Sequence, residues 1–99
     1  MSDAPDELAH RRRVLARALH VYFEADLAWA SAARAARTWF PAGARPQARP
    51  IGDPGSRVRR LHEGRERALL RLCAAREKFE TARKRAAGTP RVRLLLLRP

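Results

Sequence analysis

The sequence predicts an all-α protein: an antiparallel two-helix hairpin with a coiled-coil-like, alanine-rich seam and a short apolar C-terminal tail. Two long stretches repeat apolar residues in steps of three and four, and alanine recurs along that repeat. A segment rich in proline and glycine separates the stretches. This period is typical of helices that pack along one another. We expect a hairpin over residues 1–88, with helices over about 4–40 and 54–87 joined by a connector over 41–53, followed by a basic, leucine-rich tail over 89–99.

The first helix has favourable signals at both ends. Asp3 can cap it, and Asp6 and Glu7 place negative charge near the positive end of the helix dipole. Pro41 follows the last apolar residue and ends the pattern. The predicted seam comprises Leu15, Ala18, Tyr22, Ala25, Trp29, Ala32, Ala36 and Trp39. Trp39 and Phe40 are expected to close the hairpin as an apolar plug, or else to stack on a base.

The second helix is expected to begin at Asp53 and Pro54, a capping residue followed by proline at the first helical position. Gly88 and Pro90 form a stop signal after Ala87. The predicted seam comprises Val58, Leu61, Arg65, Ala68, Leu72, Ala75, Phe79, Ala82 and Ala86. Arg65 is a charged residue on an otherwise apolar seam.

The register of the hairpin follows if the chain folds about residue 47. Trp29 then lies near Arg65, which predicts a cation–π contact and explains the charged seam position. The same fold pairs Tyr22 with Leu72, Ala25 with Ala68 and Leu15 with Phe79. A shift by one helical turn is compatible with the same pattern.

A second set of apolar residues lies outside the seam. These residues are Leu19, Phe23, Leu27 and Ala30 in the first helix and Leu69, Leu70 and Cys73 in the second. Leu94 and Leu96 of the separate tail are also expected interface residues. A hairpin buries one stripe per helix, so the second stripe predicts a protein interface. Three occupants are possible: a second copy completing a four-helix bundle, the chain's own tail, or a different protein. The tail could also add to a partner's groove or sheet edge, or touch a membrane surface.

The chain is strongly basic, with 22 basic and 10 acidic residues and a net charge of +12. All the basic residues except Lys78 and Lys84 are arginines, which suit bidentate contacts to phosphate. A GC-rich genome would also favour arginine. The expected nucleic-acid-binding residues are Arg11, Arg12, Arg13, Arg83, Lys84 and Arg85 at one end of the hairpin and Arg57, Arg59 and Arg60 at the tip. Alternatively, these residues face water and pair with acids such as Glu7 and Glu80, or they contact an acidic protein partner.

Nothing in the sequence indicates catalysis, a metal site, a cofactor or a small-molecule substrate. His10, His20 and His62 are too far apart along the predicted helices to share a metal, and Cys73 is the single cysteine. No apolar run reaches the roughly 18 residues that a membrane span requires. The acidic start is unlike a secretory signal, so we expect a cytoplasmic protein.

Two functions fit these observations. The first is a non-enzymatic, self-associating helical protein that binds nucleic acid or a ribonucleoprotein, independently of sequence, through its arginine-rich ends. The alternative is a structural or adaptor protein that binds a protein partner through the exposed apolar stripe and the leucine tail. No base-reading motif is present, such as a helix-turn-helix or a zinc finger.

Overall fold

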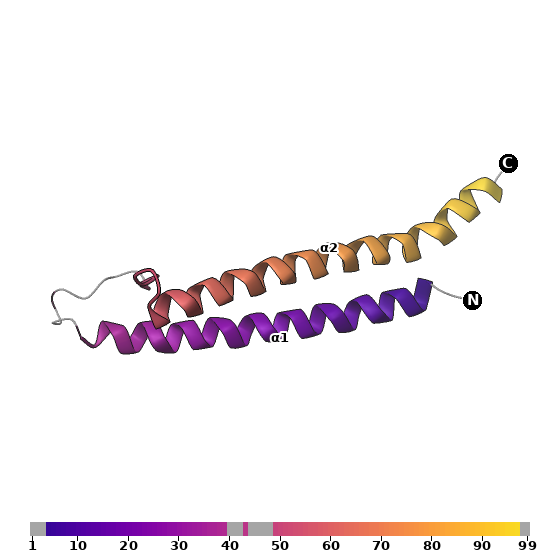
Figure 1. Ribbon diagram of the computed structural model, residues 1–99. Helices are drawn as coiled ribbons and strands as arrows, with labels where there is room; N and C mark the ends of the chain where they lie inside the picture. The colour runs from indigo at the N-terminus through magenta and orange to yellow at the C-terminus, as the bar shows by residue number, and fades with distance from the viewer. Residues whose placement is uncertain (1–3, 40–42, 44–48, 98–99) are drawn as a thin grey trace.

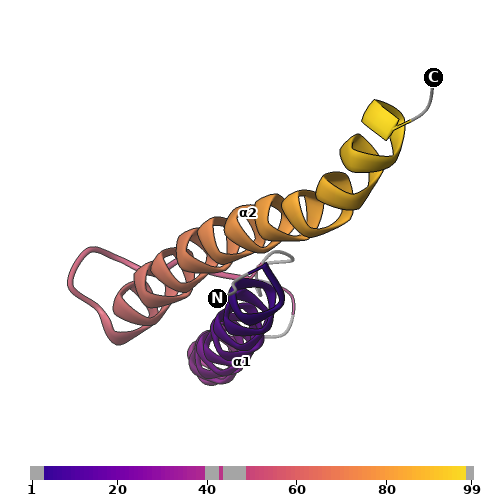
Figure 2. The ribbon, with the colours of Figure 1, turned by 90° about the vertical axis from the view of Figure 1, so that its right-hand side faces the viewer.

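The computed structural model is an antiparallel hairpin of two long helices, α1 (Ala4–Arg37) and α2 (Arg57–Leu97) (Figure 1). It describes residues 4–39, 43 and 49–97, and this part of the chain contains no strand. The all-α hairpin predicted from the sequence is therefore confirmed. The molecule is a rod measuring 74 × 26 × 18 Å. The helices lie side by side, and the last turns of α2 extend beyond the start of α1 (Figures 1 and 2).

The end of α1 lies slightly earlier than expected. The helix stops at Arg37, and a turn follows in which Thr38 N and Trp39 N donate to the carbonyls of Ala35 and Ala36 at 3.3 and 3.2 Å. The Thr38 hydroxyl also donates to Ala35 O at 2.6 Å. Hydrogen bonds between residues three positions apart tighten a helix end and satisfy carbonyls that have no partner within the α-helix. Phe40 and Pro41, which were expected to end the helix, lie outside the described residues.

The core between the helices consists almost entirely of alanine. The buried residues are Trp29, Ala33, Ala68, Ala75 and Ala82. The last three recur every seven residues, as the predicted seam of the second helix requires. In α1 the buried position is Ala33, whereas the predicted Ala32 is half-buried. A step of four after Trp29 therefore replaces the predicted step of three, which is within the tolerance of a 3.6-residue turn.

The register differs from a fold about residue 47 by about one turn. The guanidinium of Arg12, rather than the side chain of Leu15, lies over the Phe79 ring at 5.9 Å. The ring of His62 lies against Trp29, with 4.8 Å between ring centroids. The predicted contact between Arg65 and Trp29 is confirmed at 5.2 Å, because the long arginine side chain spans the extra turn.

The start of α2 is set by Ser56 rather than by Asp53. Ser56 Oγ accepts a hydrogen bond from Arg59 N at 3.1 Å, which is N-cap geometry, and the helix begins at Arg57. Asp53 and Pro54 instead form the first half of a tight turn, closed by Ser56 N donating to Asp53 O at 3.0 Å. Gly55 has a φ of 80°, as the third residue of a type II turn requires. The predicted cap at Asp53 is therefore wrong.

Two arginines and one glycine fix this turn against α2. Arg59 Nε donates to Gly52 O at 2.9 Å, and Arg60 Nη1 donates to Gly55 O at 2.7 Å. Gly52 has a φ of 91°, and a Cβ there would lie 2.8 Å from Arg59 N and 2.9 Å from Val58 Cβ. Only glycine satisfies both constraints at this position.

The C-terminal part of α2 continues beyond the predicted stop. The helix passes through Gly88 and Pro90 and ends at Leu97, so the predicted end at Ala87 is wrong. A proline inside a helix removes one backbone bond and displaces the carbonyl four residues earlier, which kinks the helix without necessarily ending it. The leucines and arginines that follow have high helix propensity. Figure 1 shows α2 curving away from α1 over these turns.

We expect Gly52→Ala to destabilise the protein more than Gly55→Ala. Both substitutions force a positive φ on an L-residue, which costs about 1–2 kcal/mol. Only the Cβ at residue 52 also meets backbone and side-chain atoms, whereas nothing lies within 4 Å of a Cβ at residue 55. Urea unfolding followed by circular dichroism measures both free energies. An equal loss in the two variants would contradict the close packing at Gly52.

Candidate functional site

The antiparallel fold brings two basic triplets from distant parts of the sequence to the open end of the hairpin. Arg85 Nη1 lies 3.6 Å from a carboxylate oxygen of Glu7, and Arg12 covers Phe79 across the helix pair. Residues 11–13 of α1 and 83–85 of α2 are therefore neighbours. We call this set the basic end; its members are Arg11, Arg12, Arg13, Arg83, Lys84 and Arg85.

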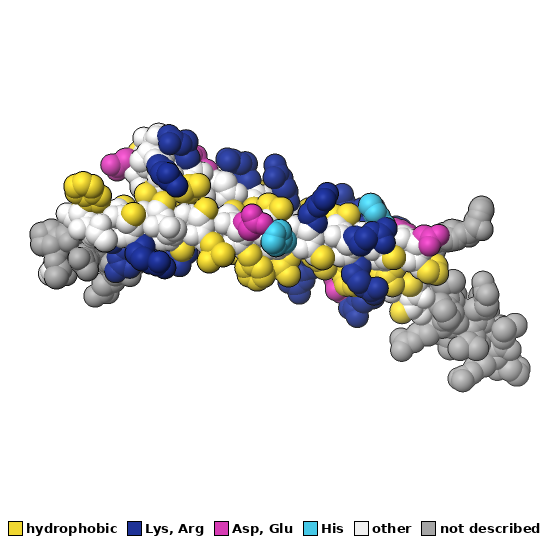
Figure 3. Space-filling view, turned by 90° about the horizontal axis from the view of Figure 1, so that it is seen from below, with side chains coloured by type: hydrophobic (Ala, Val, Ile, Leu, Met, Phe, Trp, Pro, Cys, Tyr) yellow, Lys and Arg dark blue, Asp and Glu magenta, His cyan; other side chains and the backbone are white. Residues whose placement is uncertain are grey.

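The basic end is largely open to solvent. Five of its six side chains are exposed and Arg11 is half-buried. Residues 4–17 and 75–88 together hold nine basic and four acidic side chains. Figure 3 shows Lys and Arg side chains of this half of the molecule projecting from the surface.

Two carboxylates pair with members of the basic end. Arg83 Nη2 donates to Glu80 at 2.7 Å, and Arg85 lies close to Glu7. The hydrogen bond from Arg83 lowers the pKa of Glu80, and the positive charges of Arg83, Arg76 and Lys84 add to this shift. The expected pairing with Glu7 and Glu80 therefore occurs, but both ion pairs are exposed. Exposed pairs contribute little free energy and exchange readily for other anions.

The basic residues expected at the hairpin tip have a different role. Arg59 and Arg60 hold the turn before α2 through their hydrogen bonds to Gly52 and Gly55. Arg57 is exposed, and no hydrogen bond or ion pair is recorded for its side chain among the described residues. Two of the three tip candidates are therefore parts of the fold, and the basic end is the stronger candidate for an anion surface.

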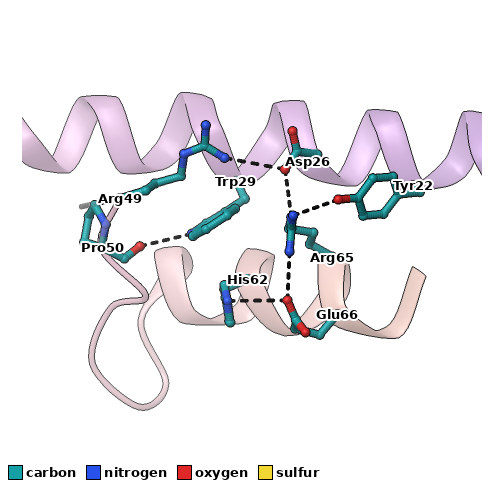
Figure 4. Close-up of polar contacts among 8 residues, drawn as sticks. All are labelled: Tyr22, Asp26, Trp29, Arg49, Pro50, His62, Arg65 and Glu66. Carbon is teal, nitrogen blue, oxygen red and sulfur yellow. Dashed lines mark hydrogen bonds and ion pairs between the residues drawn. The ribbon is translucent and has the colours of Figure 1, made fainter. Parts of the chain in front are cut away.

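A polar cluster centred on Arg65 joins the helices near the turn (Figure 4). Arg65 Nε donates to Asp26 at 2.7 Å, Nη2 to the Tyr22 hydroxyl at 2.7 Å, and Nη1 to Glu66 at 2.9 Å. All three guanidinium nitrogens therefore have a partner. The hydrogen bond to Asp26 raises the pKa of Arg65, so this side chain stays charged at every physiological pH.

Trp29 connects the same cluster to the connector. Its indole Nε1 donates to Pro50 O at 3.1 Å, and the guanidinium of Arg49 lies 4.6 Å from its ring. Arg49 Nη1 also reaches Asp26 at 3.5 Å. The cluster therefore joins α1, α2 and the returning connector, and its polar groups form hydrogen bonds and ion pairs with one another. This arrangement indicates a structural role.

The described residues hold no group of three or more His, Cys, Asp or Glu side chains arranged to bind a metal ion. Within the same residues, no helix is both long and apolar enough to cross a membrane. Cys73 is a free, exposed cysteine on α2.

Five of the expected protein-interface residues are exposed, but these five do not form one stripe. Phe23 is 55% exposed, Leu27 68% and Leu70 71%, and Leu19 and Cys73 are also exposed. Leu69 is half-buried, and the side chains of Leu94 and Leu96 lie outside the described set. Leu27 and Leu70 each stand two positions from a buried residue, Trp29 and Ala68. Two positions turn a helix by about 200°, so these leucines lie on the outer backs of their own helices.

A groove that the sequence reasoning missed lies between the helices. Val14, Arg17 and Val21 of α1 and Ala68, Arg71 and Ala75 of α2 line it, and its volume is about 240 Å³. Val14 and Val21 are exposed and seven residues apart. Each valine directly precedes a predicted seam residue, Leu15 or Tyr22, and this repeat was a signal that could have identified the groove.

The prediction that Trp39 closes the tip of the hairpin as an apolar plug is also wrong. This side chain is 88% exposed, so it does not close the described part of the hairpin. Phe40 lies outside the described residues.

Comparisons of the chain with protein-family models, with curated proteins and with solved structures each found no match. Inference about function therefore depends on the basic end, the exposed apolar residues and the groove.

We expect the Arg65–Asp26 pair to be coupled in a double-mutant cycle of Arg65→Met and Asp26→Asn. The pair is partly shielded, and Arg65 bonds to both helices, so the coupling energy should be about 1 kcal/mol. Chemical unfolding of the four proteins measures it. The exposed Arg83–Glu80 pair, treated in the same way, is the control and should show a smaller coupling. Equal coupling in both cycles would contradict a stabilising role for the Arg65 cluster.

Proposed function

We propose that this chain is a small, self-associating helical protein that binds nucleic acid or a ribonucleoprotein through the basic end, without reading sequence. The observation that carries the proposal is the meeting of residues 11–13 and 83–85 at one end of the hairpin. These six cations come from distant parts of the sequence, and the fold gathers them at one end of the rod.

The chemistry of the basic end suits phosphate. A guanidinium can donate two parallel hydrogen bonds to phosphate oxygens, and five of the six basic-end residues are arginines. Phosphates follow one another closely along nucleic acid, so several side chains of one patch can be engaged together. Glu7 and Glu80 compete with these phosphates only as exposed partners. Their ion pairs with Arg85 and Arg83 are therefore weak obstacles.

Independence from sequence follows from the residue types. Contacts to phosphate fix position along the strand but carry no information about base identity. Among the described rings at this end, that of Phe79 is half-buried and covered by Arg12. The exposed imidazole of His10 lies beside Arg13, and contact with phosphate does not require it. Base stacking is not part of the proposed contact at this end.

The proposal predicts binding that is strongly dependent on salt. The purified protein, titrated into a labelled DNA or RNA of about 20 nucleotides, should lose about a thousandfold in affinity between roughly 50 and 200 mM salt. The triple variant Arg11→Gln, Arg12→Gln, Arg13→Gln should reduce the slope of log affinity against log salt by about 3, because three phosphate contacts are lost.

A matched variant separates the basic end from net charge. Arg34→Gln, Arg37→Gln and Arg67→Gln remove the same three charges from other parts of the helices. This control should retain most of the salt slope. Equal losses in both triple variants would mean that total charge, and not the basic end, determines binding. No binding at low salt would reject the proposed function.

A second candidate function is that of a structural or adaptor protein. Its supporting observation is the exposure of Phe23 and Leu19 on one side of α1. Large apolar side chains grouped on a protein surface commonly mark an interface with another protein. The leucine tail is the other part of this candidate surface.

This second candidate predicts that a charge at Phe23 abolishes association. Phe23→Glu would place a carboxylate in the apolar contact, and sedimentation of the variant should show the mass of one chain while circular dichroism stays unchanged. Ser31→Glu, on an exposed position of the same helix, is the control. An unchanged mass for Phe23→Glu would rule out this face as the interface.

A further inference from the structure

The groove between the helices has an apolar floor bordered by positive charge. Val14 and Val21 supply one side and Ala68 and Ala75 the other, while Arg17 and Arg71 lie at its edges. No acidic side chain lines it. The floor residues on each helix are seven apart, which is two helical turns. This geometry fits a third helix that presents apolar residues at its centre and carboxylates at its margins.

The back of α2, the surface turned away from α1, has this complementary pattern. Glu66, Leu70, Cys73 and Glu77 each stand two positions from a buried alanine, and all four are exposed. The order along the helix is acid, apolar, apolar, acid over about 16 Å. Glu66 already accepts a hydrogen bond from Arg65, so Glu77 is the acid that pairs with a second copy. The floor of the groove between Val14 and Val21 is about 10 Å long, and the central apolar pair, which spans about 5 Å, fits within it.

Charge decides how two copies can meet. Two grooves facing each other would bring Arg17 and Arg71 against their own copies, and two α2 backs would oppose glutamates. Like charges placed together in an interface are unfavourable. A groove facing the back of another α2 brings arginine next to glutamate instead.

We infer that the back of α2 in one copy occupies the groove of a second copy. Leu70 then packs between Val14 and Val21, and Glu77 lies near Arg71 or Arg17. The inference rests on the self-association in the proposed function and specifies its arrangement. The groove and the back of α2 are different surfaces, so each copy uses its groove to bind one neighbour and its α2 back to bind another. The contact therefore repeats into a chain or ring instead of closing as a symmetric dimer.

Mixing two variants that each break one of the two surfaces tests this arrangement. Val21→Arg places a charge on the groove floor and leaves the α2 back intact, whereas Glu77→Arg breaks the back and leaves the groove intact. Both changes add positive charge, so the two altered surfaces do not pair with each other. Each variant alone should sediment as a monomer. An equimolar mixture retains one intact groove and one intact back, so it should form a dimer of twice the 11.2 kDa chain mass and grow no further. The wild type should grow with concentration, and reducing conditions exclude disulfides through Cys73.

Three controls define the remaining outcomes. Ser31→Arg and Glu24→Arg carry the same types of substitution at exposed positions elsewhere and should assemble like the wild type. Phe23→Glu should also assemble, in contrast to the second candidate function. The inference would be overturned if the mixture failed to form a dimer. It would also be overturned if each variant alone associated like the wild type. In both cases self-association itself would still hold. A wild type that is monomeric at every concentration would reject both self-association and the inference, without affecting nucleic-acid binding.

Discussion

The close approach of two helices through alanine is the constraint on which the rest of the structure depends. Ala33, Ala68, Ala75 and Ala82 are buried because each has little beyond a methyl group to place between the helices. A methyl group buries little apolar area, and the stabilisation from burial grows with that area. The seam therefore fixes the geometry of the pair more than its stability. Larger apolar side chains such as Leu27 and Leu70 remain outside, where they are available for contacts with other molecules.

The Arg65 cluster compensates for this thin core. Among the residues whose burial is described, Trp29 is the one large buried side chain, and arginines from α2 and from the connector lie against its ring. The hydrogen bond to Pro50 and the ion pairs to Asp26 join segments that the alanine seam does not hold. Alanine packing thus holds the helices together along the rod, and the polar cluster holds them together near the turn.

The sequence was sufficient for the architecture and for the contact between Trp29 and Arg65, because helical periodicity and a single charged seam residue are strong signals. It was insufficient at positions where local signals compete. Ser56 caps α2 because the turn uses Asp53 and Pro54, and α2 continues through Pro90 to Leu97. The groove at Val14 and Val21 depends on the rotation of the helices about their axes. Periodicity identifies the packed stripe but does not determine the shape of its borders.

A core made of methyl groups also affects how the fold responds to heat and denaturant. The heat capacity change on unfolding and the denaturant m-value both scale with the surface that becomes exposed, and this hairpin hides little. Its stability curve is therefore shallow, and its unfolding transition spreads over a wide range of temperature. Any partner that covers additional apolar surface on the helices increases that hidden area, and its binding is then visible as a sharper melting transition.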